Sequence, residues 1–271
     1  MGIVNVTPDS FSDGGLFLDA QAAVDHALHL VDEGADILDV GGESTRPYST
    51  PVDEAEELRR VVPVIEALAR RTSVPISIDT SKSAVARAAL DLGAEIVNDV
   101  TGLTGDPHMI QTAIAASAGI CAMHMQGTPQ TMQDAPTYHD VVSEIYDYFR
   151  ERKESLTAAG LDPARICLDP GIGFGKTHQH NLTLLANCRR LHELGSPLLV
   201  GPSRKGFIAK VIGCAAAQET DRLYGTIGVA LSLASQGVQI LRVHDVRPVR
   251  EALELYEACG GIDGRPLELG E

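Results

Sequence analysis

The feature that most constrains the fold is a short unit that recurs along the chain. Each copy opens on a glycine, continues as a strand of mostly aliphatic residues and ends in polar residues, as at positions 34–40, 93–100 and 237–244. The segment before the first copy carries apolar residues at the spacing of one helix face, namely Val24, Ala27, Leu28 and Val31. Helix ends in left-handed conformation are expected at Gly93, Gly119, Gly160, Gly195, Gly237 and Gly260. The pattern therefore predicts strands that alternate with helices.

Eight strands are predicted, at residues 2–6, 36–40, 75–80, 95–100, 120–125, 166–169, 197–201 and 239–243. Two helices are centred on residues 24–31 and 58–65, and six more cover 83–92, 107–117, 138–159, 181–194, 220–236 and 248–259. Strands separated by helices run parallel, and eight such units close most readily into a TIM (β/α)₈ barrel, here one domain over residues 1–271. A doubly wound open sheet is the alternative, but no Gly-x-Gly-x-x-Gly follows the first strand.

Composition narrows the range of partners. The 37 acidic and 22 basic residues give a net charge of −15, which disfavours nucleic acid and anionic membranes because the sequence contains no basic run that could bind them. No apolar run is long enough to span a bilayer, and the first residues lack the layout of a signal peptide, so we expect a cytoplasmic protein. The five cysteines form no Cys-x-x-Cys pair, which argues against a disulfide framework and a zinc site.

In a TIM barrel the chemistry lies where the strands end at their carboxyl side. Asp79, Asn98 and Asp169 end three of the predicted strands, and two carboxylates with one amide suit a flat heterocycle rich in N–H donors. The alternative is that each residue caps a neighbouring loop, and for Asp39 and Asp99 the cap is the preferred interpretation. His124, between two methionines, is interpreted as structural.

Cations gather at the ends of the last two strands. The apolar run 197–200 breaks at Gly201 and Pro202 and is followed by Ser203, Arg204 and Lys205, which indicates either an anion site or a solvated surface loop. Alternation places Ser203 and Lys205 on one face and Arg204 on the other. Arg242 and His244 also share a face and together form a clamp for an anion.

Two loops complete the predicted rim. Residues 5–15 carry oxygen ligands and glycines that could hold Mg²⁺ on a phosphate, although the segment could equally be a capped entry to the first helix. Residues 41–47 offer one cation, Arg46, for a carboxylate.

Together, residues 2–15, 41–47, 77–80, 123–127, 168–171, 203–205 and 242–245 resemble the dihydropteroate synthase family. The resemblance covers essentially the whole chain. It implies a TIM-barrel transferase of folate biosynthesis, commonly a homodimer. Such enzymes join 6-hydroxymethyl-7,8-dihydropterin diphosphate to p-aminobenzoate and release pyrophosphate, with Mg²⁺ as cofactor and sulfonamides competing for the p-aminobenzoate site.

The resemblance also implies roles for individual residues. The pterin would be held by Asp79, Asn98, Asp169 and Lys205, with Met123 against its face. The diphosphate would be bound by Asn5, Arg242 and His244, with Mg²⁺ placed by Asn5 and Asp13. The p-aminobenzoate site would be lined by Thr45, Arg46, Pro47, Ser203, Phe11 and Phe174, and the chemistry would depend most on Lys205, Asp13 and Arg46.

Two other functions remain open at this point. A methyltransferase that handles methyl-tetrahydrofolate would keep the pterin site but would need no diphosphate clamp, so Arg242, His244 and the loop with Asn5 and Asp13 count against it. A pterin-binding protein without activity is the third possibility. An assay with Mg²⁺ and both substrates distinguishes all three.

Overall fold

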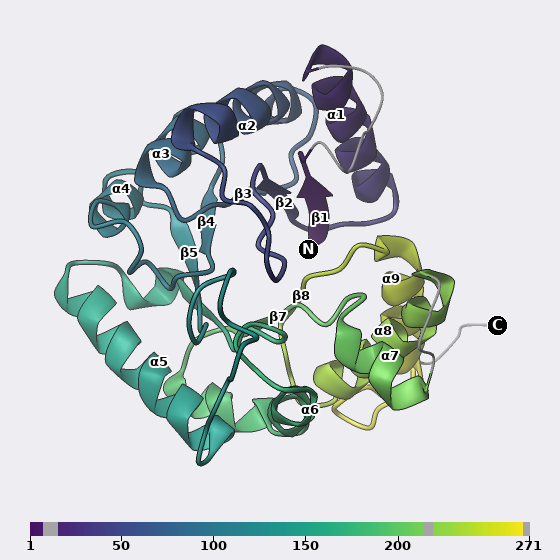
Figure 1. The fold of residues 1–271 in the computed structure, drawn as a ribbon. Coiled ribbons are helices and arrows are strands. Elements are labelled where there is room, and N and C mark those ends of the chain that lie inside the picture. The colour runs from purple at the N-terminus through teal and green to yellow at the C-terminus, as the bar shows by residue number, and fades with distance from the viewer. Residues whose placement is uncertain (8–15, 214–218, 268–271) are drawn as a thin grey trace.

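The computed structural model describes residues 1–7, 16–213 and 219–267. Within them, short parallel strands form a ring with helices around the outside (Figure 1). The strands are β1 Gly2–Asn5, β2 Leu38–Gly41, β3 Ile76–Asp79, β4 Ile96–Asp99, β5 Gly119–Met123, β6 Ile166–Asp169, β7 Leu199–Val200 and β8 Ile240–Leu241. Each predicted strand is present, but β7 and β8 are only two residues long.

The ring is closed at two seams. Strands β1 to β6 form one continuous parallel sheet, and β7 and β8 form a separate parallel pair. Single bridges join the two parts, Leu168 to Leu198 on one side and Gly2 to Val243 on the other. Because β1 lies beside β8, the (β/α)₈ barrel is confirmed and the open doubly wound sheet is wrong.

The helices follow the strands in order. They are α1 Leu16–Asp32, α2 Glu54–Ala69, α3 Ser83–Asp91, α4 Met109–Ala115, α5 Val141–Ala158, α6 His178–Ala186, α7 Gly206–Ile212, α8 Glu219–Ala234 and α9 Val246–Ala258, with 3₁₀ helices η2 Pro163–Arg165 and η3 Cys188–Leu194. In the described part of the chain, none of them is both long enough and apolar enough to cross a membrane.

One predicted helix is broken in the structure, and one further helix was not predicted. The helix expected at 181–194 is broken at Asn187, whose backbone leaves the helical region and whose side-chain amide donates to the Thr183 carbonyl at 2.8 Å. Helix α7 was not predicted, because seven residues between Lys205 and the left-handed Gly213 are too few to show a period.

Capping side chains and glycines with positive φ mark the ends of several helices. Asp53 and Asp140 cap α2 and α5 by accepting backbone N–H donors in the first turn. Five of the six expected glycines have positive φ, but Gly119 does not, because it already belongs to β5 and the left-handed residue is Ser117.

Side chains on the strands alternate between two environments. Val4, Val40, Ile78 and Val97 are fully or almost fully buried under the surrounding helices, where α2 contributes Val61, Ile65 and Leu68. The alternate positions point into the barrel and are largely polar: Asp39, Ser77, Asp79, Asn98 and Asp169. The fold therefore buries a polar cluster directly below the mouth of the barrel.

Candidate active site

Arg242, just after β8, connects three strands inside the barrel. Its Nε donates to Asp39 Oδ2 at 2.6 Å and its Nη2 donates to Asp79 Oδ2 at 2.8 Å. Asn98 Nδ2 donates to the same Asp39 oxygen at 3.1 Å. Burial alone would lower the pKa of Arg242, but the two carboxylates raise it, so the guanidinium is permanently charged.

The interpretation of Asp39 as a loop cap was wrong. Its side chain is completely buried, and one oxygen serves both Arg242 and Asn98 while Oδ1 has no partner. Asp99 does act as a cap, because its Oδ1 accepts from both the backbone N and the Oγ1 of Thr101 at 2.8 Å.

Asp79 and Asp169 are acceptors with unusual proton affinity. Burial raises the pKa of Asp79 to about 7, a shift that Arg242 opposes and Asp39 increases. Burial likewise raises the pKa of Asp169 to about 6, although the Gly171 N–H, which donates to its Oδ1 at 2.8 Å, stabilises the ionised form. Removal from water dominates in both cases.

Lys205 lies in the same mouth. Its Nζ lies 4.4 Å from the ring centroid of Phe174, within the range of a cation–π contact. Burial and then Arg242 lower its pKa to about 8, while Asp169 and Asp79 raise it and Arg46 lowers it further. The structure thus brings Asp79, Asp169 and Lys205 to one end of the barrel.

Ser203 and His244 form a pair. The Ser203 Oγ lies 3.0 Å from His244 Nδ1 and accepts from the His244 backbone N–H at 3.2 Å. Burial lowers the pKa of His244 to about 3, and Arg204 and Arg242 lower it too, so the imidazole is neutral near pH 7. His244 can therefore contribute an N–H donor to an anion, but not a charge.

Strand alternation does not apply to Arg204, which lies in the loop after β7 with a φ of 56° and pairs with Asp245. Its Nε and Nη2 contact the two carboxylate oxygens of Asp245 at 3.1 and 2.7 Å. A guanidinium engaged in this fork joins the loop after β7 to the start of α9.

The β2–α2 loop carries Thr45, Arg46 and Pro47, and its tip crosses to the β5–α5 loop. The Tyr48 N–H donates to the Pro129 carbonyl at 3.0 Å, and the Tyr48 hydroxyl donates to Asp134 at 3.3 Å. Arg46 is exposed, and its charge still acts on Lys205. The loop therefore lies over the mouth of the barrel.

Of the remaining predicted residues, the structure describes Asn5 and Met123 but not Phe11 and Asp13. Asn5 ends β1 in register with Gly41, and Met123 is buried at the end of β5 in register with Asp169. Phe11 and Asp13 lie outside the described residues.

Sequence reasoning missed a buried lysine behind the mouth. Lys176 Nζ lies 3.0 Å from His124 Nδ1 and donates to the Phe174 carbonyl at 2.8 Å. Burial lowers the pKa of Lys176 to about 7 and that of His124 to about 3. His124 is buried and its ring also packs against Tyr148, which fits its interpretation as structural. The sequence feature that could have drawn attention to Lys176 is its position at the end of a glycine-rich segment, residues 171–176.

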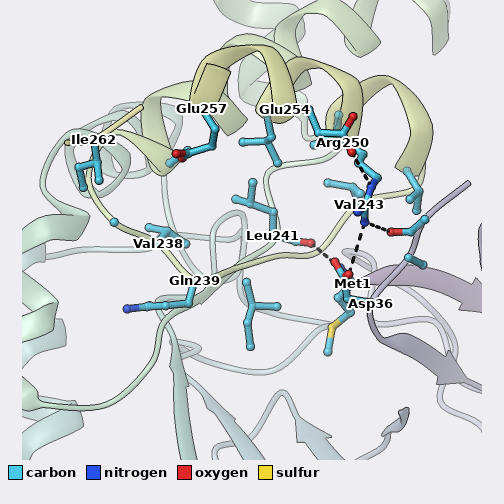
Figure 2. A pocket seen from close by; sticks show the side chains of 18 of the residues that line it. Met1, Asp36, Val238, Gln239, Leu241, Val243, Arg250, Glu254, Glu257 and Ile262 are labelled. Carbon is cyan, nitrogen blue, oxygen red and sulfur yellow. Dashed lines mark hydrogen bonds and ion pairs between the residues drawn. The ribbon is translucent and has the colours of Figure 1, made fainter. Parts of the chain in front are cut away.

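A cavity of about 930 Å³ lies at the end of the barrel opposite the mouth (Figure 2). Its walls come from Met1, from residues just before β2, from residues in and around β8, and from α9 and the segment after it; none of the predicted site residues lines it. Arg250 reaches from α9 to the Gly34 carbonyl at 2.7 Å and to Asp36 at 3.4 Å, so this cation is already paired. The chemistry is concentrated at the mouth, not in this cavity.

Known proteins share this architecture. Residues 1–244 match the family model described as "Pterin binding enzyme". The dihydropteroate synthase of Escherichia coli K12 is 46% identical over 258 residues, which cover 95% of this chain and 90% of that protein. The structure of the Yersinia pestis dihydropteroate synthase with a sulfonamide drug has a TM-score of 0.89 at 44% identity, covering 95% of this chain and 92% of that one.

A dihydropteroate synthase from Xanthomonas albilineans in complex with 7,8-dihydropteroate has a TM-score of 0.86 at 44% identity, covering 95% of this chain and 92% of that one. These matches confirm the resemblance seen in the motifs and the prediction of a transferase. The chain belongs to the dihydropteroate synthase family of pterin-binding enzymes.

Proposed function

We propose that the mouth of the barrel carries out the family's reaction, in which 6-hydroxymethyl-7,8-dihydropterin diphosphate and p-aminobenzoate give 7,8-dihydropteroate and pyrophosphate. The observation that carries this proposal is the meeting of Asp79, Asp169, Lys205 and Arg242 at one end of the barrel. This group combines acceptors for a heterocycle with cations for an anionic leaving group.

The pterin would lie among Asp79, Asn98 and Asp169. A pterin edge presents a ring N–H beside an exocyclic amine, and a carboxylate can accept both. Asp169 keeps its Oδ2 available, since Gly171 engages Oδ1. Lys205 would donate to an acceptor of the ring, and Met123 would pack against its face.

The diphosphate would be bound by Arg242, by the neutral His244 and by Asn5. In a chain of net charge −15, these local donors are needed to offset the repulsion of an anion. Asn5 and Asp13 would hold Mg²⁺, which fits the preference of this ion for few protein oxygens beside phosphate oxygens. Bound Mg²⁺ would neutralise charge on the leaving diphosphate.

The p-aminobenzoate would lie between the β2–α2 loop and Phe174, with Arg46 pairing its carboxylate and Thr45, Pro47, Ser203 and Phe11 completing the site. Sulfonamides would compete here, in keeping with the Yersinia pestis complex. In the reaction the C–O bond to the diphosphate breaks, the C–N bond to the arylamine forms, and the amine loses one proton to solvent. No nucleophilic side chain is required.

An assay of pyrophosphate release tests the proposal. Release should require both substrates and Mg²⁺, and it should stop in excess chelator and resume when Mg²⁺ is restored. Asn5→Ala and Asp13→Ala should weaken the response to Mg²⁺ more than the binding of p-aminobenzoate. Methyl transfer without pyrophosphate release would favour the methyltransferase, and pterin binding without turnover would favour the binding protein. Full activity in chelator would refute the metal requirement.

We also propose that the protein is a cytoplasmic homodimer. Val211 and Ile212 on α7 and Tyr224 on α8 are exposed apolar side chains, and Tyr224 is 77% exposed. Exposed apolar side chains on neighbouring helices are typical of protein interfaces. The four described cysteines are free thiols, which fits a reducing compartment. Sedimentation of Tyr224→Asp against the parent tests the interface, since the variant should sediment as a monomer.

A further inference from the structure

A partly buried ion-pair cluster lies beside the mouth and is not part of the site described above. The Lys82 Nζ donates to Glu43 Oε2 at 2.6 Å and to Glu57 Oε2 at 2.5 Å. Lys82 precedes α3, Glu57 lies in the first turn of α2, and Glu43 begins the β2–α2 loop. One ammonium thus joins the loop to two helices.

Glu43 also ties together the two ends of the loop. While Oε2 faces Lys82, Oε1 accepts the Val52 N–H at 2.9 Å. Arg60 on α2 adds a third contact by donating to the Gly42 carbonyl at 2.8 Å. Thr45, Arg46 and Pro47 all lie between the two ends that Glu43 holds.

The base and the tip of this loop are held by different forces. At the base, Lys82 forms two short, charged contacts of which one partner, Glu57, is 0% exposed. At the tip, Tyr48 and Ser49 form hydrogen bonds of 3.0 to 3.3 Å with the β5–α5 loop. Charge-assisted contacts are the stronger of the two kinds, so the base sets the position of the loop.

Helix stability does not account for Lys82. It occupies the N-cap position of α3 and makes no side-chain capping bond. A cation there opposes the helix dipole. Lys82 instead serves as the counter-ion of Glu57, which is buried and whose Oε1 has no partner.

We infer that Lys82 is a positioning residue for the p-aminobenzoate site, since it fixes the base of the β2–α2 loop through Glu43 and Glu57. This inference rests on the proposed function for the identity of the substrate. Without Lys82, Glu43 and Glu57 would face each other as unpaired carboxylates, and Glu43 would turn outward and release the loop.

The test compares Lys82→Met, Glu57→Gln and their combination with the parent. The single Lys82 variant leaves a buried uncompensated carboxylate and so risks misfolding. In the double variant the residue at position 57 is neutral, so no uncompensated charge is buried there, while Glu43 still lacks its cation. Arg70→Met, which removes an exposed pair with Glu66 on the same helix α2, is the matched control.

Two measurements decide the outcome. Amide hydrogen exchange of residues 43–52 needs no substrate and should be faster in the double variant than in the Arg70 control. The KM for p-aminobenzoate should rise roughly ten- to hundredfold, the scale of a small misplacement of a binding group, while the Kd for the pterin diphosphate stays within about twofold. Lys82→Arg should recover part of the p-aminobenzoate KM.

Unchanged exchange over residues 43–52 would overturn the anchoring role. Faster exchange with an unchanged p-aminobenzoate KM, or an equal loss of pterin and p-aminobenzoate affinity, would overturn the role at this site. A parent protein without turnover would refute the proposed function, and with it the link to p-aminobenzoate, while the exchange measurement would still decide whether Lys82 anchors the loop.

Discussion

Asp169→Asn is the substitution that tests the pterin site most directly. In the parent, Oδ1 accepts the Gly171 N–H at 2.8 Å, which leaves Oδ2 for the proposed contact with the pterin. Asparagine can keep the first contact with its single oxygen. Its NH₂ group would then replace Oδ2 and point a donor at the N–H donors of the pterin edge.

The magnitude follows from the contacts that are lost. A buried donor without a partner costs roughly 1–3 kcal/mol, and a lost charged acceptor adds to this. At about 1.4 kcal/mol per decade, pterin binding should weaken roughly ten- to several-hundred-fold.

The substitution should weaken pterin binding without lowering the stability of the fold. The folded-state pKa of Asp169, about 6, is above the ordinary 3.8. The stability this group contributes is therefore present below its unfolded pKa and is lost as the pH rises through about 6. At pH 7 the variant removes an ionised carboxylate that the fold disfavours, so Tm should not fall.

Calorimetry with the pterin diphosphate, or with a pterin lacking the diphosphate, measures the effect. Asp99→Asn is the matched control, because burial raises the pKa of Asp99 to about 6 as well, and this carboxylate caps the turn at Thr101. The control should bind the pterin like the parent. If folded Asp169→Asn also binds like the parent, Asp169 is only a partner of Gly171 and the pterin is recognised elsewhere.

Three further outcomes are expected. Lys205→Ala should reduce turnover more than Arg204→Ala, which loses the fork to Asp245 and should mainly lower Tm; equal losses of turnover in two folded variants would contradict the geometry. Asp39→Asn should destabilise the fold by about 1–3 kcal/mol in urea unfolding, since the nearer partner of Arg242 loses its charge and the new NH₂ group replaces Oδ1, which has no partner; an unchanged midpoint would show that Asp79 suffices. The kcat/KM for the pterin diphosphate should fall below about pH 7, as Asp79 and then Asp169 bind a proton, and above about pH 8 as Lys205 loses one. Lys205→Arg should shift only the alkaline limb upward, and an unmoved limb would assign it to another group.

The strand ends could be predicted because a parallel barrel brings all of them to one rim and side chains alternate along each strand. This reasoning placed Asp79 and Asp169 correctly at one end of the barrel, whereas Lys205 lies beyond the end of β7, at the start of α7. It failed for Asp39, whose partner Arg242 lies 203 positions away, and no local pattern reveals a contact at that distance. The same applies to Lys82, whose two carboxylates come from different elements. Helix α7 was not predicted because it is too short to show the helical spacing of apolar residues.

Arg242 also contributes to the closure of the barrel. At the seam between β1 and β8, a single bridge, Gly2 to Val243, joins the strands. Arg242, next to that bridge, adds two ionic contacts across the interior to β2 and β3. Contacts between such distant parts of a chain form late in folding, because their loop-closure entropy must be met first. The guanidinium proposed to bind the diphosphate therefore also completes the barrel, and substitution at this position would impair assembly of the fold together with substrate binding.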